Sequence, residues 1–121
     1  MQAKSKGYCG ESLAEKYLIN KGYKILDKNF TVRGGEIDII AHKNGIFVFA
    51  EVKTRTQNSF GEGNESVDSR KKKRILRAAQ RYLDSKIKNP DPDFRLDIIE
   101  IELNSENGAV KNINHFEDIE V

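Results

Sequence analysis

The order of hydrophobic and polar positions along this chain predicts two helices and five strands. Spacings of three and four residues predict helices at residues 5–21 and about 70–86, and strand-like apolar runs between turn residues predict strands at residues 23–32, 36–41, 46–53, 94–103 and 110–116, extendable to 119. The predicted order is α-β-β-β-α-β-β. A chain of 121 residues suits one hydrophobic core, so we expect a single domain over residues 1–121.

The second and third predicted strands flank Asn44-Gly45, the strongest short signal for a β-hairpin. A two-residue loop there sets the register, with the predicted opposed pairs being Lys43 with Ile46, Ile40 with Phe49, Asp38 with Glu51, and Glu36 with Lys53. Directly opposed residues share one face of the sheet. The register therefore predicts three carboxylates and one ammonium group on one face at the open end of the hairpin.

The second arm of this hairpin, residues 46–53, is apolar on both faces, which is typical of a central strand covered on both sides. Glu51 and Lys53 interrupt that pattern. A surface ion pair at a fraying strand end is the structural alternative, but Val52 between them stays apolar. Like charges opposite each other destabilise a strand pair, so Asp38 facing Glu51 predicts a bound cation.

Carboxylates are the hard oxygen ligands that Mg²⁺ or Mn²⁺ prefers. We expect Asp38 and Glu51 to bind such an ion, with Glu36 and Glu11 as further ligands. Lys53 completes a predicted catalytic set with Asp38 and Glu51, either orienting or deprotonating a water or neutralising developing charge. Two alternatives stay open, because Glu36 also suits a cross-strand partner of Lys53 and Glu11 also suits a solvated acid in the first helix.

The first half of the second predicted helix is strongly basic. Basic side chains at a helix N-terminus oppose the helix dipole, and a phosphate partner would compensate for that cost. A solvated helix face is the alternative, because a short basic cluster is not specific. The residues that we expect to contact a nucleic-acid backbone are Arg33, Arg55, Lys71, Lys72, Lys73 and Arg74. The polar residues 54–67 predict a loop beside this surface.

Composition excludes several classes of protein. Hydrophobic residues make up 37% and charged residues 33% of the chain, with no apolar run near the ~20 residues of a membrane span. No apolar segment follows the first residues, so no secretory signal is expected. Cys9 is the only cysteine and cannot form an internal disulfide, which predicts a reducing cytoplasmic location. Two histidines and no CxxC motif disfavour a structural zinc site.

The order Asp38, twelve residues, then Glu51-Val52-Lys53 resembles the D…(D/E)-x-K signature of the PD-(D/E)XK nuclease superfamily. A wider set of residues resembles the YraN family, small bacterial proteins of uncharacterised function that are similar to archaeal Holliday-junction resolvases. The residues that carry this wider resemblance are Gly10-Glu11, 33–41 (RGGEIDIIA), 47–55 (FVFAEVKTR), Phe60-Gly61, Val67 with Lys71, Ala78-Ala79 with Tyr82-Leu83, and Arg95-Leu96-Asp97.

The resemblance implies an α/β (α+β) fold with a restriction-endonuclease-like core, in which a mixed sheet of about five strands has a helix on each face. It also implies a Mg²⁺-dependent site at Glu11, Glu36, Asp38, Glu51 and Lys53. Ile37 stands where the superfamily pattern has proline, and the acidic and lysine positions are intact. A resolvase-like protein would further act as a homodimer, because paired cuts need paired sites.

These observations predict a Mg²⁺-dependent endonuclease that acts on DNA rather than RNA, with branched or structured DNA as its substrate. The first alternative is a nucleic-acid-binding module without turnover, such as an adaptor in DNA processing. The second is a structural or protein-binding domain whose acidic face pairs with lysines. A fold alone does not decide among them, because function depends on the site.

Overall fold

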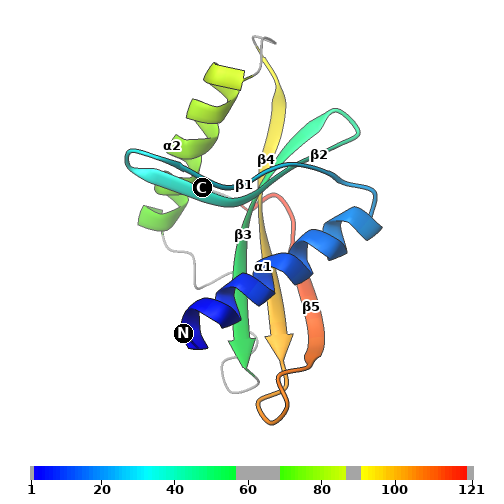
Figure 1. Ribbon diagram of the computed structural model, residues 1–121. Coiled ribbons are helices and arrows are strands. Elements are labelled where there is room, and N and C mark those ends of the chain that lie inside the picture. Colours follow the sequence, from blue (N-terminus) through cyan, green and yellow to red (C-terminus); the bar gives the residue numbers. More distant parts are fainter. Residues whose placement is uncertain (1, 57–68, 87–90, 120–121) are drawn as a thin grey trace.

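A five-stranded mixed sheet lies between two helices (Figure 1). The computed structural model describes residues 2–56, 69–86 and 91–119, with side chains from residue 10 onward. The elements are α1 (Gln2–Asn20), β1 (Lys24–Val32), β2 (Gly35–Lys43), β3 (Ile46–Thr56), α2 (Ser69–Lys86), β4 (Asp93–Leu103) and β5 (Val110–Phe116). The predicted fold class and element order are confirmed.

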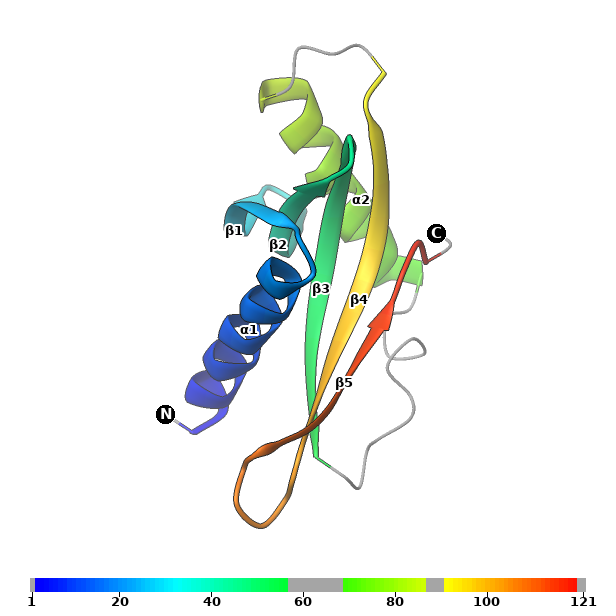
Figure 2. The ribbon, with the colours of Figure 1, turned by 90° about the vertical axis from the view of Figure 1, so that its right-hand side faces the viewer.

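The strands follow one another across the sheet in chain order, β1-β2-β3-β4-β5. All neighbouring pairs are antiparallel except β3 and β4, which run parallel and so need a crossover connection that contains α2. Figure 1 shows β1 and β2 running crosswise to β3 and β4. In Figure 2, α1 and α2 lie on opposite sides of β3 and β4, as the resemblance implied.

Both faces of β3 are packed, which confirms the central-strand prediction. Phe49 belongs to a core shared with α2, whereas its neighbours Val48 and Ala50 belong to a core shared with α1. All three side chains are fully buried. Burial of alternate residues on opposite faces fixes the strand register, because a shift by one residue would exchange the two sets.

Several predicted boundaries are corrected. The first helix begins at Gln2, before the predicted residue 5, and β3 continues to Thr56, past the predicted residue 53, because it pairs with β4 as far as Leu103. The predicted loop at 54–67 falls mostly on residues 57–68, which lie outside the described residues. Across the described part of the chain, neither helix combines the length and apolar content needed to cross a membrane.

The Asn44-Gly45 hairpin forms as predicted. Asn44 and Gly45 both have positive φ angles, 53° and 81°, as a type I′ turn requires. Lys43 pairs with Ile46, and the register continues as far as Ile39 and Ala50. The predicted pairing of Asp38 with Glu51 and of Glu36 with Lys53 is wrong, because β2 leaves β3 beyond this point and stays paired only with β1.

Gly35, at the start of β2, lets α2 pack directly on the β1–β2 turn. A Cβ atom there would overlap the Arg74 carbonyl oxygen and lie 3.1 Å from the Ala78 nitrogen. We expect Gly35→Ala to reduce the free energy of unfolding by about 3 kcal/mol, because backbone atoms of α2 would have to move. Urea denaturation followed by circular dichroism measures this change.

Gly45→Ala is the matched control. It has open space around the added methyl group and pays only for its positive φ angle, about 1 kcal/mol. A Gly35→Ala protein as stable as the Gly45→Ala protein would contradict the close packing of α2 on the turn.

Candidate metal-binding and catalytic site

The Asp38 side chain spans the gap that opens where β2 and β3 separate. Its Oδ2 atom accepts a hydrogen bond of 2.8 Å from the backbone N–H of Val52. Burial, and after it the nearby charge of Glu51, raise the pKa of Asp38 to about 7, against the opposing effects of the Val52 hydrogen bond and the charge of Lys71. Asp38 and Glu51 therefore form an interacting carboxylate pair, although their backbones are not paired.

Glu51 is 4% exposed, and two lysines approach the same oxygen of its side chain. Glu51 Oε2 lies 3.4 Å from Lys53 Nζ, on the same strand, and 3.1 Å from Lys71 Nζ, in the first turn of α2. The structure thus brings together the three predicted catalytic residues, Asp38, Glu51 and Lys53. Lys71, predicted as a phosphate contact, lies instead on a carboxylate of the site.

Helix α1 reaches this site because Gly10 allows it to approach β3. Gly10 is buried, and a Cβ atom at that position would overlap the Thr54 hydroxyl oxygen. The next residue, Glu11, is half-buried. The close approach of the helix therefore carries Glu11 toward the end of β3 where the charged side chains lie.

The electrostatics of Glu11 show which groups surround it. Burial raises its pKa, a hydrogen bond with the Asn29 side chain lowers it, the charges of Glu51 and Glu36 raise it, and Lys28 lowers it. A small cavity of about 70 Å³ lies beside it, lined by Glu11, Ser12, Lys28 and Asn29. Glu11 thus belongs to the same acidic cluster as Asp38 and Glu51.

Glu36 is the outermost of the predicted ligands. It is exposed and pairs across the sheet with Thr31 of β1, while Lys53 is ion-paired with Glu51. The proposed cross-strand partnership of Glu36 and Lys53 is therefore not formed. Glu36 influences the site through its charge on Glu11.

The donor set suits a hard divalent cation. Within the described residues, no three His, Cys, Asp or Glu side chains form a ready-made metal-binding group. Mg²⁺, however, usually takes only one or two protein carboxylates and keeps several waters. The Asp38–Glu51 pair meets that requirement, since the repulsion between the two carboxylates would be relieved by a cation bound to both.

The residues predicted to contact nucleic acid differ in solvent exposure. Arg33, Lys73 and Arg74 are exposed and Lys72 is half-buried. Arg55 differs, because its Nε atom is buried and lies 3.9 Å from an oxygen of the fully buried Glu100. Part of the Arg55 guanidinium thus faces a buried carboxylate, while its side chain as a whole is 25% exposed.

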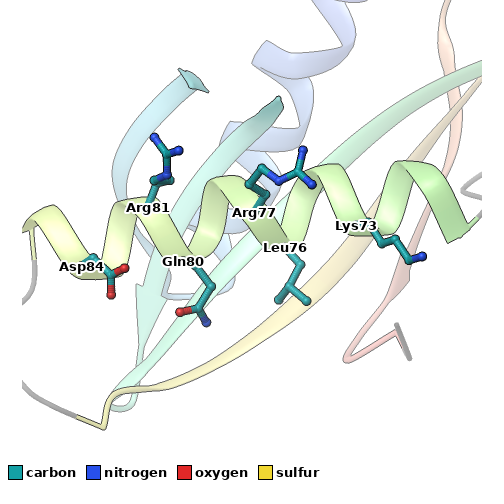
Figure 3. Close-up of a pocket in the computed structure, with 6 residues that line it drawn as sticks. All are labelled: Lys73, Leu76, Arg77, Gln80, Arg81 and Asp84. Atoms are coloured by element: carbon teal, nitrogen blue, oxygen red, sulfur yellow. The ribbon is translucent and has the colours of Figure 1, made fainter. Parts of the chain in front are cut away.

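The basic surface continues along α2 beyond the predicted residues. A shallow groove of about 400 Å³ is lined, within the described part of the chain, by six residues of α2, namely Lys73, Leu76, Arg77, Gln80, Arg81 and Asp84 (Figure 3). Three of its basic residues recur every fourth position, so they follow one side of the helix. Arg77 also donates a hydrogen bond of 3.3 Å to the Gly34 carbonyl oxygen, linking the groove to the β1–β2 turn.

A buried polar network on β4 gives a structural role to Arg95 and Asp97, which carry part of the family resemblance but had no role predicted from the sequence. Asp97, 1% exposed, accepts hydrogen bonds from His115 Nε2 at 2.7 Å, Arg95 Nε at 3.0 Å and the Asp118 N–H at 3.0 Å. Burial acts to raise the pKa of Asp97, but these hydrogen bonds outweigh it and lower the pKa. Tyr17 of α1 lies 3.1 Å from the other ring nitrogen of His115. The network ties α1 and the end of β5 to the sheet.

Only part of this network carried a sequence signal. Arg95 and Asp97 stand two residues apart in a strand pattern, so they share a sheet face. No spacing rule connects them with Tyr17 or His115, which lie far away in the chain.

Comparison with known proteins places this chain among close relatives. The model of the uncharacterised protein family UPF0102 matches residues 10–101. A UPF0102 protein of Caldanaerobacter subterraneus subsp. tengcongensis is 47% identical over 113 residues, covering 93% of this chain and 91% of that protein. One from Clostridioides difficile is 43% identical, covering 95% and 96%, and one from Clostridium perfringens is 50% identical, covering 81% and 80%. The chain belongs to the uncharacterised protein family UPF0102.

Proposed function

We propose that this protein is a Mg²⁺-dependent endonuclease that hydrolyses phosphodiester bonds of DNA, with branched or structured DNA as its substrate. The observation that carries this proposal is the carboxylate pair of half-buried Asp38 and buried Glu51, with Lys53 at 3.4 Å from Glu51. Carboxylates with raised pKa values and specific charged neighbours are typical of functional sites. The resemblance to PD-(D/E)XK nucleases gives this arrangement its reaction class.

Asp38 and Glu51 are the proposed ligands of Mg²⁺ or Mn²⁺, with Glu11 and Glu36 in the surrounding acidic cluster. A bound ion would supply an activated water and stabilise charge on the phosphoryl oxygens. Lys53 has a fixed place beside Glu51, from which its ammonium group would orient the attacking water or neutralise developing charge.

The basic surface would hold the phosphate backbone without reading sequence. It comprises the exposed Arg33 of the β1–β2 turn, the first turns of α2 and the groove that contains Arg77 and Arg81. The hydrogen bond from Arg77 to Gly34 joins the two parts. This basic surface extends from the β1–β2 turn along α2, and Lys71 of the same helix contacts Glu51. A surface of this length favours a long polyanion over a small substrate.

Two further features follow from the proposal. Paired cuts in branched DNA require two sites, so a homodimer is the active form that we propose. The cytoplasm is the proposed location, since the single cysteine forms no internal disulfide.

Cleavage of branched, duplex and single-stranded DNA, with Mg²⁺, Mn²⁺ or EDTA, tests the proposal. We expect the wild-type protein to cleave only with a divalent ion, and Glu51→Gln and Lys53→Met to reduce the rate at least about 10³-fold. Glu106→Gln, an exposed carboxylate in the β4–β5 turn, is the control and should leave the rate unchanged. If the wild type, Glu51→Gln and Lys53→Met proteins behave alike on every substrate, the enzyme proposal is lost.

A second candidate function is a nucleic-acid-binding module without turnover. It is favoured by the two lysines that already neutralise Glu51. This candidate predicts DNA binding whose affinity falls with salt at a log–log slope of about −0.9 per phosphate contacted, without cleavage. Lys72→Glu should weaken that binding, whereas Asp38→Asn should not.

A further inference from the structure

Two cations share one buried oxygen at Glu51, but they are held there in different ways. Lys53 is fixed by the sheet, because it lies two residues beyond Glu51 on the same strand. Lys71 comes from α2, and its side chain is 35% exposed, against 22% for Lys53. Lys71 is thus the more solvent-exposed of the two cations at Glu51.

Lys71 lies against one of the two carboxylates that we propose as metal ligands. Its Nζ atom lies 3.1 Å from Glu51 Oε2, and its charge also acts favourably on ionised Asp38. An ammonium group in contact with Glu51 Oε2 would compete with a divalent cation for that carboxylate oxygen. Each would also repel the other at short range.

We propose that Lys71 is an internal counterion, which neutralises the Asp38–Glu51 carboxylate pair in the metal-free protein and withdraws from Glu51 when a divalent cation binds. This inference rests on the metal site of the proposed function. It assigns Lys71 a positioning role that the phosphate-contact prediction did not include.

A Lys71 side chain that withdraws from Glu51 would lie next to other basic residues of α2. Lys71 stands in the first turn of α2 beside Lys72, Lys73 and Arg74, three residues of the proposed backbone-binding surface. Release of Lys71 would therefore add one cation to that surface only in the metal-loaded protein. By linkage, nucleic acid that binds the released Lys71 would tighten metal binding by the same factor.

Mn²⁺ titration, with free Mn²⁺ followed by electron paramagnetic resonance, tests the proposal. Lys71→Met keeps the length of the side chain without its charge and should bind Mn²⁺ about tenfold more tightly than the wild type, because a competing cation is removed. Lys71→Arg restores the charge and should bind about as weakly as the wild type. Lys73→Met is the matched control for net charge in the same turn and should stay within about twofold of the wild type.

Thermal unfolding in EDTA gives a second readout that needs no metal. Lys71→Met should melt at a lower temperature than Lys73→Met, because Glu51 loses a counterion while it remains buried. Saturating Mn²⁺ should then raise the melting temperature of Lys71→Met by more than that of the wild type.

The outcomes separate this inference from the function on which it rests. If the wild type and Lys71→Met bind Mn²⁺ equally, the counterion role is overturned while the metal site stands. If neither protein nor the Lys71→Arg variant binds Mn²⁺, both the metal site and the counterion role are overturned. The proposal is supported if Lys71→Met binds Mn²⁺ more tightly than the wild type, and Lys71→Arg and Lys73→Met do not.

Discussion

Asp38→Asn is expected to make the metal-free protein more stable at pH 8 while removing its cleavage of DNA. Asparagine is nearly the same size as aspartate, and its amide oxygen can still accept the hydrogen bond from Val52. It removes the charge that repels Glu51 and the carboxylate that we propose as a metal ligand. We expect a gain in the free energy of unfolding of about 1–3 kcal/mol at pH 8.

The pH dependence of this gain follows from the direction of the pKa shift. The pKa of Asp38 rises from 3.8 to about 7 on folding. Between these values the folded chain holds a proton that the unfolded chain has lost, so the stabilising contribution of this carboxyl group is lost as pH rises toward 7. Asp38→Asn should therefore change stability little at pH 4 and most at pH 8.

Urea denaturation in EDTA at pH 4 and pH 8 measures this difference, and a cleavage assay with Mg²⁺ measures the loss of activity. Glu106→Gln removes an exposed carboxylate and should change stability by less than about 0.5 kcal/mol at either pH. If Asp38→Asn is less stable than the wild type at pH 8, the ionised Asp38 side chain stabilises the folded protein, and the predicted repulsion between Asp38 and Glu51 is contradicted.

Asp97→Asn is expected to have the opposite effect and to destabilise the protein by about 3–5 kcal/mol at pH 7. The substitution places an amide N–H₂ donor among the donors of Arg95, His115 and the Asp118 backbone, so at least one buried hydrogen bond is lost. Arg95 would also lose the nearer of two ion-pair partners, Asp97 at 3.0 Å, and keep only the exposed Glu117 at 3.7 Å among the described residues. Urea denaturation at several pH values measures the loss.

The lowered pKa of Asp97 sets the pH range of that penalty. A carboxylate with a lowered pKa stabilises the fold above its unfolded value of about 4, and this stabilisation disappears as pH falls through the folded value. The penalty should thus shrink below about pH 4. Asp93→Asn, exposed at the start of the same strand, is the control. Equal stability of the two variants would contradict the structural role of the network.

The fold was predictable because local rules and burial agree in most elements. Asn44-Gly45 determines the turn and the register as far as Ile39 and Ala50, and the apolar residues on both faces of β3 predict a covering layer on each side. The bounds of β5, Val110–Phe116, are the predicted ones. In these elements the neighbouring residues carry the information.

The site was less predictable because its geometry depends on how elements bend and dock. A period-two pattern cannot show that the pairing of β2 with β3 ends at Ile39 and Ala50. Asp38 lies just outside the paired region and contacts β3 through its side chain, which accepts the hydrogen bond from Val52. Gly10 brings α1 onto Thr54 by close packing that composition does not reveal. The contact of Lys71 with Glu51 likewise depends on the docking of α2, whereas the sequence shows only a basic helix.

The central claim is that Asp38 and Glu51 bind a divalent cation, and crystals of the protein soaked in Mn²⁺ test it most directly. We predict one anomalous peak within about 2–2.5 Å of a carboxylate oxygen of each residue, with Lys71 withdrawn from Glu51. A well-ordered site without an anomalous peak at saturating Mn²⁺, with Lys71 still at 3.1 Å from Glu51, would contradict the claim.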